Sequence, residues 1–255
     1  MIAGEARLLR IAVQFLTRLP VGHIETLESG ELDRSAKYFP LVGALVGAIA
    51  AATLVASSLI FPDPIPIVLA LIAGTAVTGA LHEDGLADAA DGLWGGATRD
   101  RRLEIMKDSR IGAYGVLTLG FVLALKSAAL SGLGPITAAA ALIATHAGAR
   151  LTIVIALRLL PYAGDPETAK VKPLTAASNG EFALATAFGV APGLALLPLD
   201  AWIIAWIVGF LAATSFGLIA MRRIQGYTGD ILGAIEQLFE VGFLLGAAAV
   251  ISGPG

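Results

Sequence analysis

Long uncharged runs separated by short polar segments dominate the pattern of this chain. Examples are 38–62, 64–81, 182–199 and 201–221, none of which contains a charged residue. A helix that crosses a bilayer core needs about 20 mostly apolar residues. The pattern therefore predicts about seven membrane-spanning helices, at residues 39–61, 65–82, 112–130, 135–157, 182–199, 201–221 and 231–251.

The N-terminal segment 7–19 has a different pattern. Polar side chains recur there at helical spacing, from Arg7 and Arg10 to Gln14 and Arg18, with leucine, alanine and phenylalanine between them. This pattern predicts an amphipathic helix. The helix lies either at the membrane surface or against the bundle, and the sequence does not distinguish these two placements.

Composition changes the picture little but excludes several classes of protein. Of the 255 residues, 56% are apolar and 15% are charged, against about 25% charged in a typical soluble domain. A disordered chain, a basic nucleic-acid-binding domain and an ordinary soluble enzyme are thereby disfavoured, and we expect no nucleic-acid partner. The absence of cysteine excludes thiolate metal sites and disulfides. We expect one all-α membrane-embedded domain over residues 1–255, with close helix packing at the small residues Gly43 and Gly47.

The basic residues predict the orientation of the bundle. With the spans above, 16 of the 17 lysines and arginines fall on one side, and Lys126 alone falls on the other. Cytoplasmic loops of membrane proteins are rich in lysine and arginine. We therefore expect the N-terminus and the large loops in the cytoplasm, the C-terminus outside, and a location in the cytoplasmic (inner) membrane.

An acidic cluster carries the candidate chemistry. Asp84, Asp88 and Asp91 stand at i, i+4 and i+7, so on a helix they share about 60° of arc. Like charges so close repel each other unless a cation neutralises them. Oxygen ligands without cysteine favour Mg²⁺ or Mn²⁺ over softer ions. The alternative is a solvated acidic helix end. Gly85 and Gly92 lie on an adjacent face, where a neighbouring helix or a ligand could approach.

Basic and acidic residues elsewhere extend this interpretation. Lys107 and Arg110, with basic residues at 99–102, could hold a phosphate group, although basic cytoplasmic loops are common. At 226–230 the chain opens its last span, where Thr228 or Asp230 could cap the helix. Within that span lie Glu236 and Glu240. Because intramembrane acids usually face a partner, we considered Arg150 and Arg158 as their ion-pair partners.

These motifs together resemble the cobalamin synthase (adenosylcobinamide-GDP ribazoletransferase) family. The resembling segments are Phe15 to Pro20, Phe39 to Gly43, His82 to Gly92, Leu103 to Gly112, and Thr228 to Ala234 with Glu240. The resemblance implies transfer of α-ribazole, or its 5′-phosphate, to adenosylcobinamide-GDP with release of GMP, and Mg²⁺ as cofactor. Glu83 and Glu236 stand outside the pattern.

The residue pattern and the implied reaction together suggest a hypothesis for the role of each residue. Asp84 and Asp88 would bind the metal, and Asp91 would bind it or accept the proton of the ribazole hydroxyl. Asp230 would complete the metal site or orient the nucleophile, and Lys107 and Arg110 would hold phosphate. Further candidate substrate-binding residues are Arg18, His82, Asp108, Ser109, Thr228 and Glu240.

Two other functions stay open on the sequence. A CDP-alcohol phosphatidyltransferase has a similar spaced aspartate cluster, but this chain has Asp88 where that family's motif has an arginine after Ala87. A cation-coupled transporter would use the intramembrane acids as its path, although no inverted repeat is evident.

Overall fold

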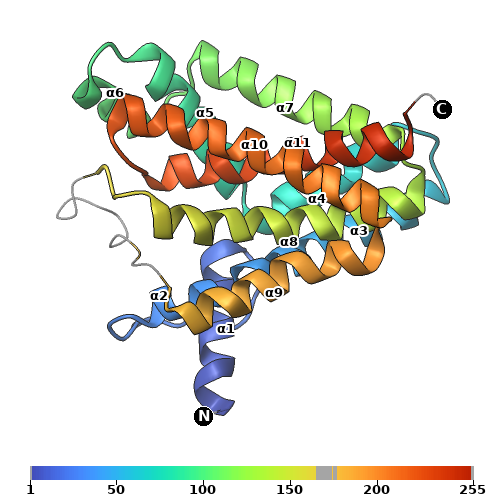
Figure 1. Ribbon diagram of the computed structural model, residues 1–255, viewed down its shortest axis with the longest axis horizontal. Coiled ribbons are helices and arrows are strands. Elements are labelled where there is room, and N and C mark those ends of the chain that lie inside the picture. Colours follow the sequence, from blue (N-terminus) through green and yellow to red (C-terminus); the bar gives the residue numbers. More distant parts are fainter. Residues whose placement is uncertain (1, 165–173, 175–176, 254–255) are drawn as a thin grey trace.

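The computed structural model describes residues 2–164, 174 and 177–253, and these residues are helical apart from their connections. The described part of the chain contains no β-strand, and one isolated β-bridge joins Tyr162 and Tyr227. Figure 1 shows the helices running mostly along the long axis of the molecule. Their bounds are α1 Ile2–Leu16, α2 Glu31–Ser35, the short 3₁₀ helix η1 Ala36–Tyr38, α3 Phe39–Ser58, α4 Ile65–Thr78, α5 Leu81–Gly95, α6 Arg99–Met106, α7 Ala113–Ser131, α8 Pro135–Leu159, α9 Asn179–Leu196, α10 Leu199–Ile224 and α11 Gly229–Ile251.

The prediction of an all-helical membrane bundle is confirmed, with a smaller number of spans. Within the described residues, five helical segments are long and apolar enough to cross a membrane: 31–58, α7, α8, α10 and α11. The bent pair α4–α5 makes a sixth if it is one span. Each of the seven predicted segments contains a helix, but α9, which covers most of 182–199, is not among these five or six. The predicted number of seven is therefore approximate.

The predicted span 65–82 is interrupted rather than continuous. α4 ends at Thr78, and α5 leaves at 89° to it. The turn consists of Gly79 and Ala80, both in the left-handed conformation with φ of 68° and 59°. α4 alone is about 21 Å long, which is less than the roughly 30 Å of a bilayer core. The break ends α4 before it could cross and turns the polar helix α5 to one side.

α3 and α8 lie so close together that a side chain would not fit between them. A Cβ atom at Gly43 would stand 2.2 Å from the carbonyl oxygen of His146, and one at Gly47 would stand 2.6 Å from that of Leu142. The close packing predicted at these two small residues is confirmed. It also brings the middle of α8, which carries His146 and Arg150, into the centre of the bundle.

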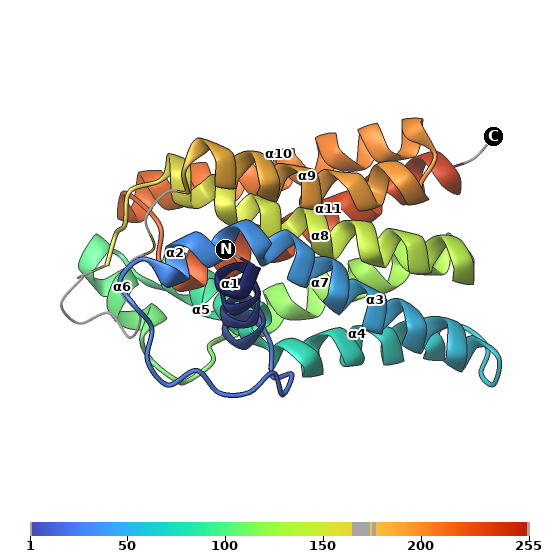
Figure 2. The same ribbon diagram turned by 90° about the horizontal axis from the view of Figure 1, so that it is seen from below.

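α1 crosses the direction of the other helices. It is vertical in Figure 1 and is seen end-on in Figure 2. One face of α1 is buried, with Leu8, Ile11 and Leu16 each no more than 3% exposed, and Glu5 pairs with Lys37 at 2.7 Å. The helix is amphipathic as predicted, and its buried face packs against α2, η1 and α3.

The polar segments and the short connections lie at opposite ends of the bundle. α6 and the end of α10 lie at the left of Figure 1, whereas the connections at 59–64, 132–134 and 197–198 lie at the right, with the C-terminus. This separation agrees with the two-sided distribution predicted from the basic residues. Lys170 and Lys172, which contributed to that prediction, lie outside the described residues.

Candidate active site

The three aspartates of the predicted cluster all lie on α5, as their spacing requires. Asp84 is exposed, Asp88 is half-buried and Asp91 is 8% exposed. Their carboxylates are not gathered at one point. Among the described residues, the ligand atoms of three acidic or histidine side chains lie within 4.8 Å of one another at a different place, in the interior. These residues are His146, Glu236 and Glu240. The aspartates thus offer a row of oxygen ligands along one face of α5.

Asp91 uses both carboxylate oxygens to hold the start of α7. It accepts hydrogen bonds from the backbone N–H of Gly112 at 2.6 Å and of Gly115 at 3.0 Å. Helix N-termini favour negative charge because their first N–H groups lack partners within the helix. Asp91 therefore fastens the loop 107–112 and α7 to α5, a role that the sequence analysis missed.

The start of α11 packs directly on α5. A Cβ atom at Gly85 would lie 3.1 Å from the Cα atom of Asp230 and 3.4 Å from that of Gly233. Of the two partners considered for Gly85, a helix is the one found. Thr228 caps α11 by accepting a hydrogen bond from Ile231 N–H at 3.3 Å, and it donates one to Asp230 at 3.4 Å. The backbone of Asp230 is thereby set beside the α5 segment that carries Asp84 and Asp88.

The loop after α6 presents its basic side chains to the surface. Lys107, Ser109 and Arg110 are exposed. Arg110 pairs with Asp108 at 2.7 Å, and this hydrogen-bonded guanidinium lowers the pKa of the Asp108 carboxyl to about 2. A phosphate that binds Arg110 would therefore replace or share the Asp108 contact. Thr228 Oγ1 lies 4.0 Å from the sulfur of Met106, so this loop begins near the start of α11.

The basic residues at 99–102 have a largely structural role. Arg99 donates to the carbonyl oxygens of Ile224 and Ala163, at 3.1 and 2.6 Å. Arg102 donates to that of Arg223 at 3.2 Å. The last carbonyls of a helix lack partners within it, so these arginines close the end of α10. Arg101 instead pairs with Glu104 at 2.6 Å, and the phosphate-binding role of Lys107 and Arg110 stays a prediction.

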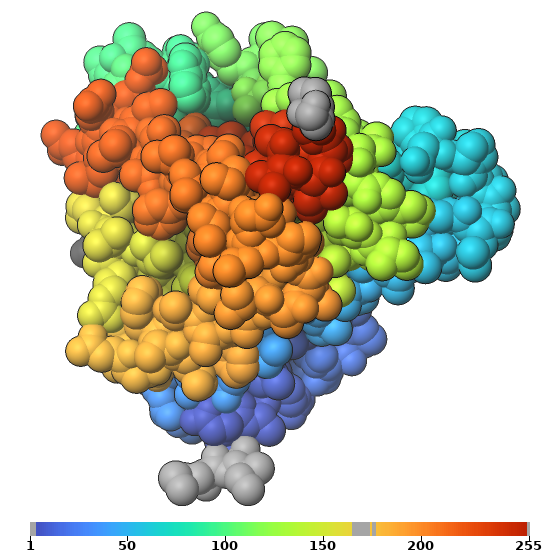
Figure 3. Space-filling model, turned by 45° about the vertical axis from the view of Figure 1, so that its right-hand side comes forward, coloured from blue at the N-terminus to red at the C-terminus, as the bar shows by residue number. Residues whose placement is uncertain are grey.

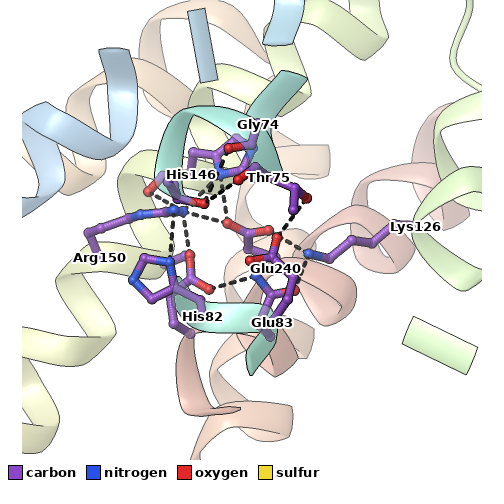
Figure 4. Close-up of polar contacts among 12 residues, drawn as sticks. Gly74, Thr75, His82, Glu83, Lys126, His146, Arg150 and Glu240 are labelled. Atoms are coloured by element: carbon purple, nitrogen blue, oxygen red, sulfur yellow. Dashed lines mark hydrogen bonds and ion pairs between the residues drawn. The ribbon is translucent and has the colours of Figure 1, made fainter. Parts of the chain in front are cut away.

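A buried network of charges lies at the centre of the bundle (Figure 4). Glu240 contacts Lys126 at 2.6 Å, His146 at 2.6 Å and Arg150 at 2.5 Å, and Arg150 also pairs with Glu236. The two acids and the two bases, Lys126, Arg150, Glu236 and Glu240, are each no more than 3% exposed. Two acids and two bases balance one another, as buried charges must.

This network corrects the predicted placement of Lys126 and decides between the two proposed partners of Glu240. Lys126 was placed on the outer side, but it points into the bundle from α7. Of the two proposed partners for Glu240, Arg150 is the one found, whereas Arg158 donates to Asn179. Glu240 is buried and has three partners, and its predicted contact with substrate stays a prediction. One sequence signal could have indicated this network: Lys126 is a lone charge between long uncharged runs, and such intramembrane charges usually have a buried partner.

The predicted substrate residues His82 and Arg18 lie at the break between α4 and α5. His82 is 3% exposed, with its Nδ1 3.4 Å from Arg150, and its Nε2 has no partner in the described residues. Arg18 is exposed and crosses Gly79, whose added Cβ would lie 2.5 Å from its Nε. His82 therefore links the start of α5 to the central network, and Arg18 lies beside the turn.

Comparison with known proteins identifies the family. The family model described as cobalamin-5-phosphate synthase matches residues 8–248. The chain belongs to this family. It is 44% identical over 254 residues to the adenosylcobinamide-GDP ribazoletransferase of Leptothrix cholodnii, covering 95% of each chain. It is 40% identical to that of Shewanella frigidimarina, with 94% of this chain and 95% of the relative covered.

Membership of the cobalamin-5-phosphate synthase family confirms the resemblance that the sequence motifs indicated. It disfavours both alternatives, a CDP-alcohol phosphatidyltransferase and a cation-coupled transporter. No solved structure matches the chain. The arrangement of α5, the loop 107–112 and the start of α11 therefore comes from the present structure alone.

Proposed function

We propose that this protein is an adenosylcobinamide-GDP ribazoletransferase, which joins α-ribazole or its 5′-phosphate to adenosylcobinamide-GDP and releases GMP. The relatives from Leptothrix and Shewanella carry this name. One structural observation supports it above all: two segments that are distant in sequence from α5 meet on it. Asp91 fastens the loop 107–112, and Gly85 contacts Asp230. Carboxylates and phosphate-binding cations thereby share one end of the bundle.

We further propose that Asp84, Asp88 and Asp230 hold Mg²⁺. The fit rests on the donor chemistry, because hard divalent cations prefer carboxylate oxygens. It also rests on accessibility, because Asp84 is exposed and Asp88 and Asp230 are half-buried. Asp91 fits less well, since both of its oxygens already accept backbone hydrogen bonds. When bound, Mg²⁺ would neutralise the charge that develops on the phosphoryl oxygens.

The side chains then divide the remaining work. Lys107 and Arg110 would hold the pyrophosphate, Lys107 as a point charge and Arg110 as a two-pronged donor. A hydroxyl oxygen of the nucleoside forms a new bond to phosphorus, and the bond from phosphorus to the GMP oxygen breaks. The hydroxyl proton passes to a carboxylate of the exposed face of α5. Asp91 is the least suited to accept it, so we assign Asp91 to positioning.

We propose that the bundle lies in the cytoplasmic membrane with its N-terminus in the cytoplasm and its C-terminus outside. The support is the distribution of polar segments, because α6 and the end of α10, which carry five of the arginines, share one end of the bundle. Both substrates would then reach the site from the cytoplasm.

The central test compares Asp84→Asn with the wild type in purified membranes. The assay follows GMP release from adenosylcobinamide-GDP and α-ribazole across a Mg²⁺ titration. Removing an outer-shell partner of a metal site typically lowers metal affinity or activity about 10- to 100-fold. We expect Asp84→Asn to lose at least that much turnover, with an unchanged unfolding temperature. Near wild-type turnover would refute the metal assignment. CDP-diacylglycerol offered in place of adenosylcobinamide-GDP should give no product, and turnover of it would refute the proposed reaction.

A further inference from the structure

An apolar groove lies beside α5, with Leu86 on the side of that helix opposite Asp84. Its volume is about 400 Å³, and α5, α7, α10 and α11 all line it. Leu86, two residues after Asp84, is turned about 200° around the helix from it. Leu86 and Phe216 are 0% and 5% exposed and form the floor of the groove. The proposed reaction does not use this groove.

The groove opens sideways, between two membrane-spanning helices. Trp94, Leu117 and Phe121 on its walls are 41%, 56% and 65% exposed, and α7 and α10 both qualify as spans. In Figure 3, atoms of α5 are visible at the top of the molecule, set back between the green surface of α7 and the orange surface of α10. The opening therefore faces the hydrocarbon of the bilayer.

One cation, Arg223, contacts Trp94, which lines the groove. Arg223 lies seven residues after Phe216, hence on the same face of α10. Its guanidinium carbon is 5.4 Å from the centre of the Trp94 ring, and its Nη1 donates to the carbonyl oxygen of Leu93 at 2.5 Å. A guanidinium carries five N–H groups. Within the described residues, the hydrogen bond to Leu93 is the one that the Arg223 guanidinium donates. Arg223 is half-buried, so its other N–H groups can meet a ligand at the groove.

We propose that this groove binds one anionic phospholipid of the surrounding bilayer. An acyl chain would lie along Leu117, Phe121 and Phe216, and the headgroup phosphate would accept hydrogen bonds from Arg223. The combination of an apolar groove open to lipid with a guanidinium beside Trp94 favours such a ligand over a neutral lipid. The inference does not depend on the proposed transferase activity.

Tryptophan fluorescence tests this directly. The chain has three tryptophans, so Trp202→Phe with Trp206→Phe leaves Trp94 in the groove as the sole emitter. The protein is reconstituted in vesicles of phosphatidylcholine that contain increasing fractions of brominated phosphatidylglycerol or brominated phosphatidylcholine. We expect quenching by the phosphatidylglycerol at about fivefold lower mole fraction, the factor that one basic side chain near a membrane surface contributes. Equal quenching by the two lipids would overturn the proposal.

Matched variants separate a built site from general surface charge. Arg223→Gln should abolish the preference, and Arg223→Lys should keep most of it. Arg222→Gln removes the same charge from the adjacent, exposed position and should leave the preference intact. Thr118→Phe, which fills the groove, should weaken quenching by both lipids. If Arg222→Gln and Arg223→Gln reduce the preference equally, or if Thr118→Phe changes nothing, the groove is not the binding site.

Discussion

At the scale of single residues, the same chemical group has opposite roles in two places. The carboxylate of Asp84 is exposed on α5, whereas that of Glu240 is 2% exposed and contacts Lys126, His146 and Arg150. An exposed carboxylate can exchange partners with a ligand. A buried one with three partners is fixed, because removing any of them leaves a charge without compensation in a medium of low dielectric constant.

Glu240→Gln should therefore destabilise the protein strongly. Removing one member of a buried ion pair typically costs about 3–5 kcal/mol, since Lys126 and Arg150 lose their shared counter-charge. Thermal unfolding in detergent micelles measures the effect. Adding Lys126→Met to Glu240→Gln should recover part of the loss, and an unfolding temperature equal to that of the wild type would show that the network contributes no stability.

Asp91→Ala should lower stability before it affects chemistry. Hydrogen bonds to a charged group contribute about 1.5–3 kcal/mol each, and this variant loses two, to Gly112 and Gly115. We expect a lower unfolding temperature and, below it, binding of Mg²⁺ measured by isothermal titration calorimetry close to that of the wild type. Loss of Mg²⁺ binding from a folded Asp91→Ala variant would return Asp91 to the metal site.

The Asp108–Arg110 pair gives a pH prediction with a defined sign. Arg110 depresses the pKa of Asp108 to about 2, from 3.8, so the pair is fully formed above pH 3.8 and is lost as the pH falls through about 2. Carboxyl ¹³C chemical shifts of Asp108 should report this midpoint. In Arg110→Gln the midpoint should return toward 3.8, and an unchanged midpoint would mean that another group sets it.

At the scale of helices, backbone contact rather than side-chain interdigitation sets the spacing of α3 and α8. Gly43 and Gly47 place the α3 backbone against the carbonyl groups of α8. Small residues permit such close approach in membrane bundles. Because α8 also carries His146 and Arg150, this spacing determines where the central charges lie.

Gly43→Ala should separate the two helices. Its Cβ would stand 2.2 Å from a backbone oxygen and 2.8 Å from the Arg150 side chain, and overpacking of this kind typically costs about 1–3 kcal/mol. Gly120→Ala on α7 is the matched control, since nothing lies within 4 Å of its Cβ. Unfolding of both variants in micelles should show a loss for the first alone. Equal stability of the two would contradict the contact.

At the scale of the whole molecule, the two ends of the bundle are chemically different. The absence of cysteine makes the proposed orientation testable with single introduced thiols. Arg101→Cys on α6 should react with a membrane-impermeant maleimide only after the cells are permeabilised. Ser131→Cys at the other end of α7 should react in intact cells. Both positions are exposed, and the reverse pattern of labelling would invert the topology.

Much of this architecture follows from local pattern, and the remainder depends on packing. The helical face of Asp84, Asp88 and Asp91 follows from spacing within one helix, and the cap at Thr228 follows from its residue type. The contact of Asp91 with Gly112 joins residues 21 positions apart, so no local rule contains it. Arg150 and Arg158 occupy the same helix, and only the position of α11 decides between them.

The break at Gly79 was hidden for a different reason. A glycine in a long apolar run is compatible with a packed membrane helix as well as with a turn. The positive φ of Gly79 and of Ala80 distinguishes the turn from a continuous helix, and residue type does not require it at Ala80. The sequence therefore predicted one straight span where the chain turns by 89°.

The central charges impose an order on biogenesis. The ribosome delivers α7 and α8 before α11, so Lys126 and Arg150 enter the membrane while Glu236 and Glu240 are still unsynthesised. Until the last helix arrives, two cations sit within apolar segments without these counter-charges. We expect chains truncated before Glu236 to keep that charge imbalance, because the C-terminal helix carries both of the network's buried acids.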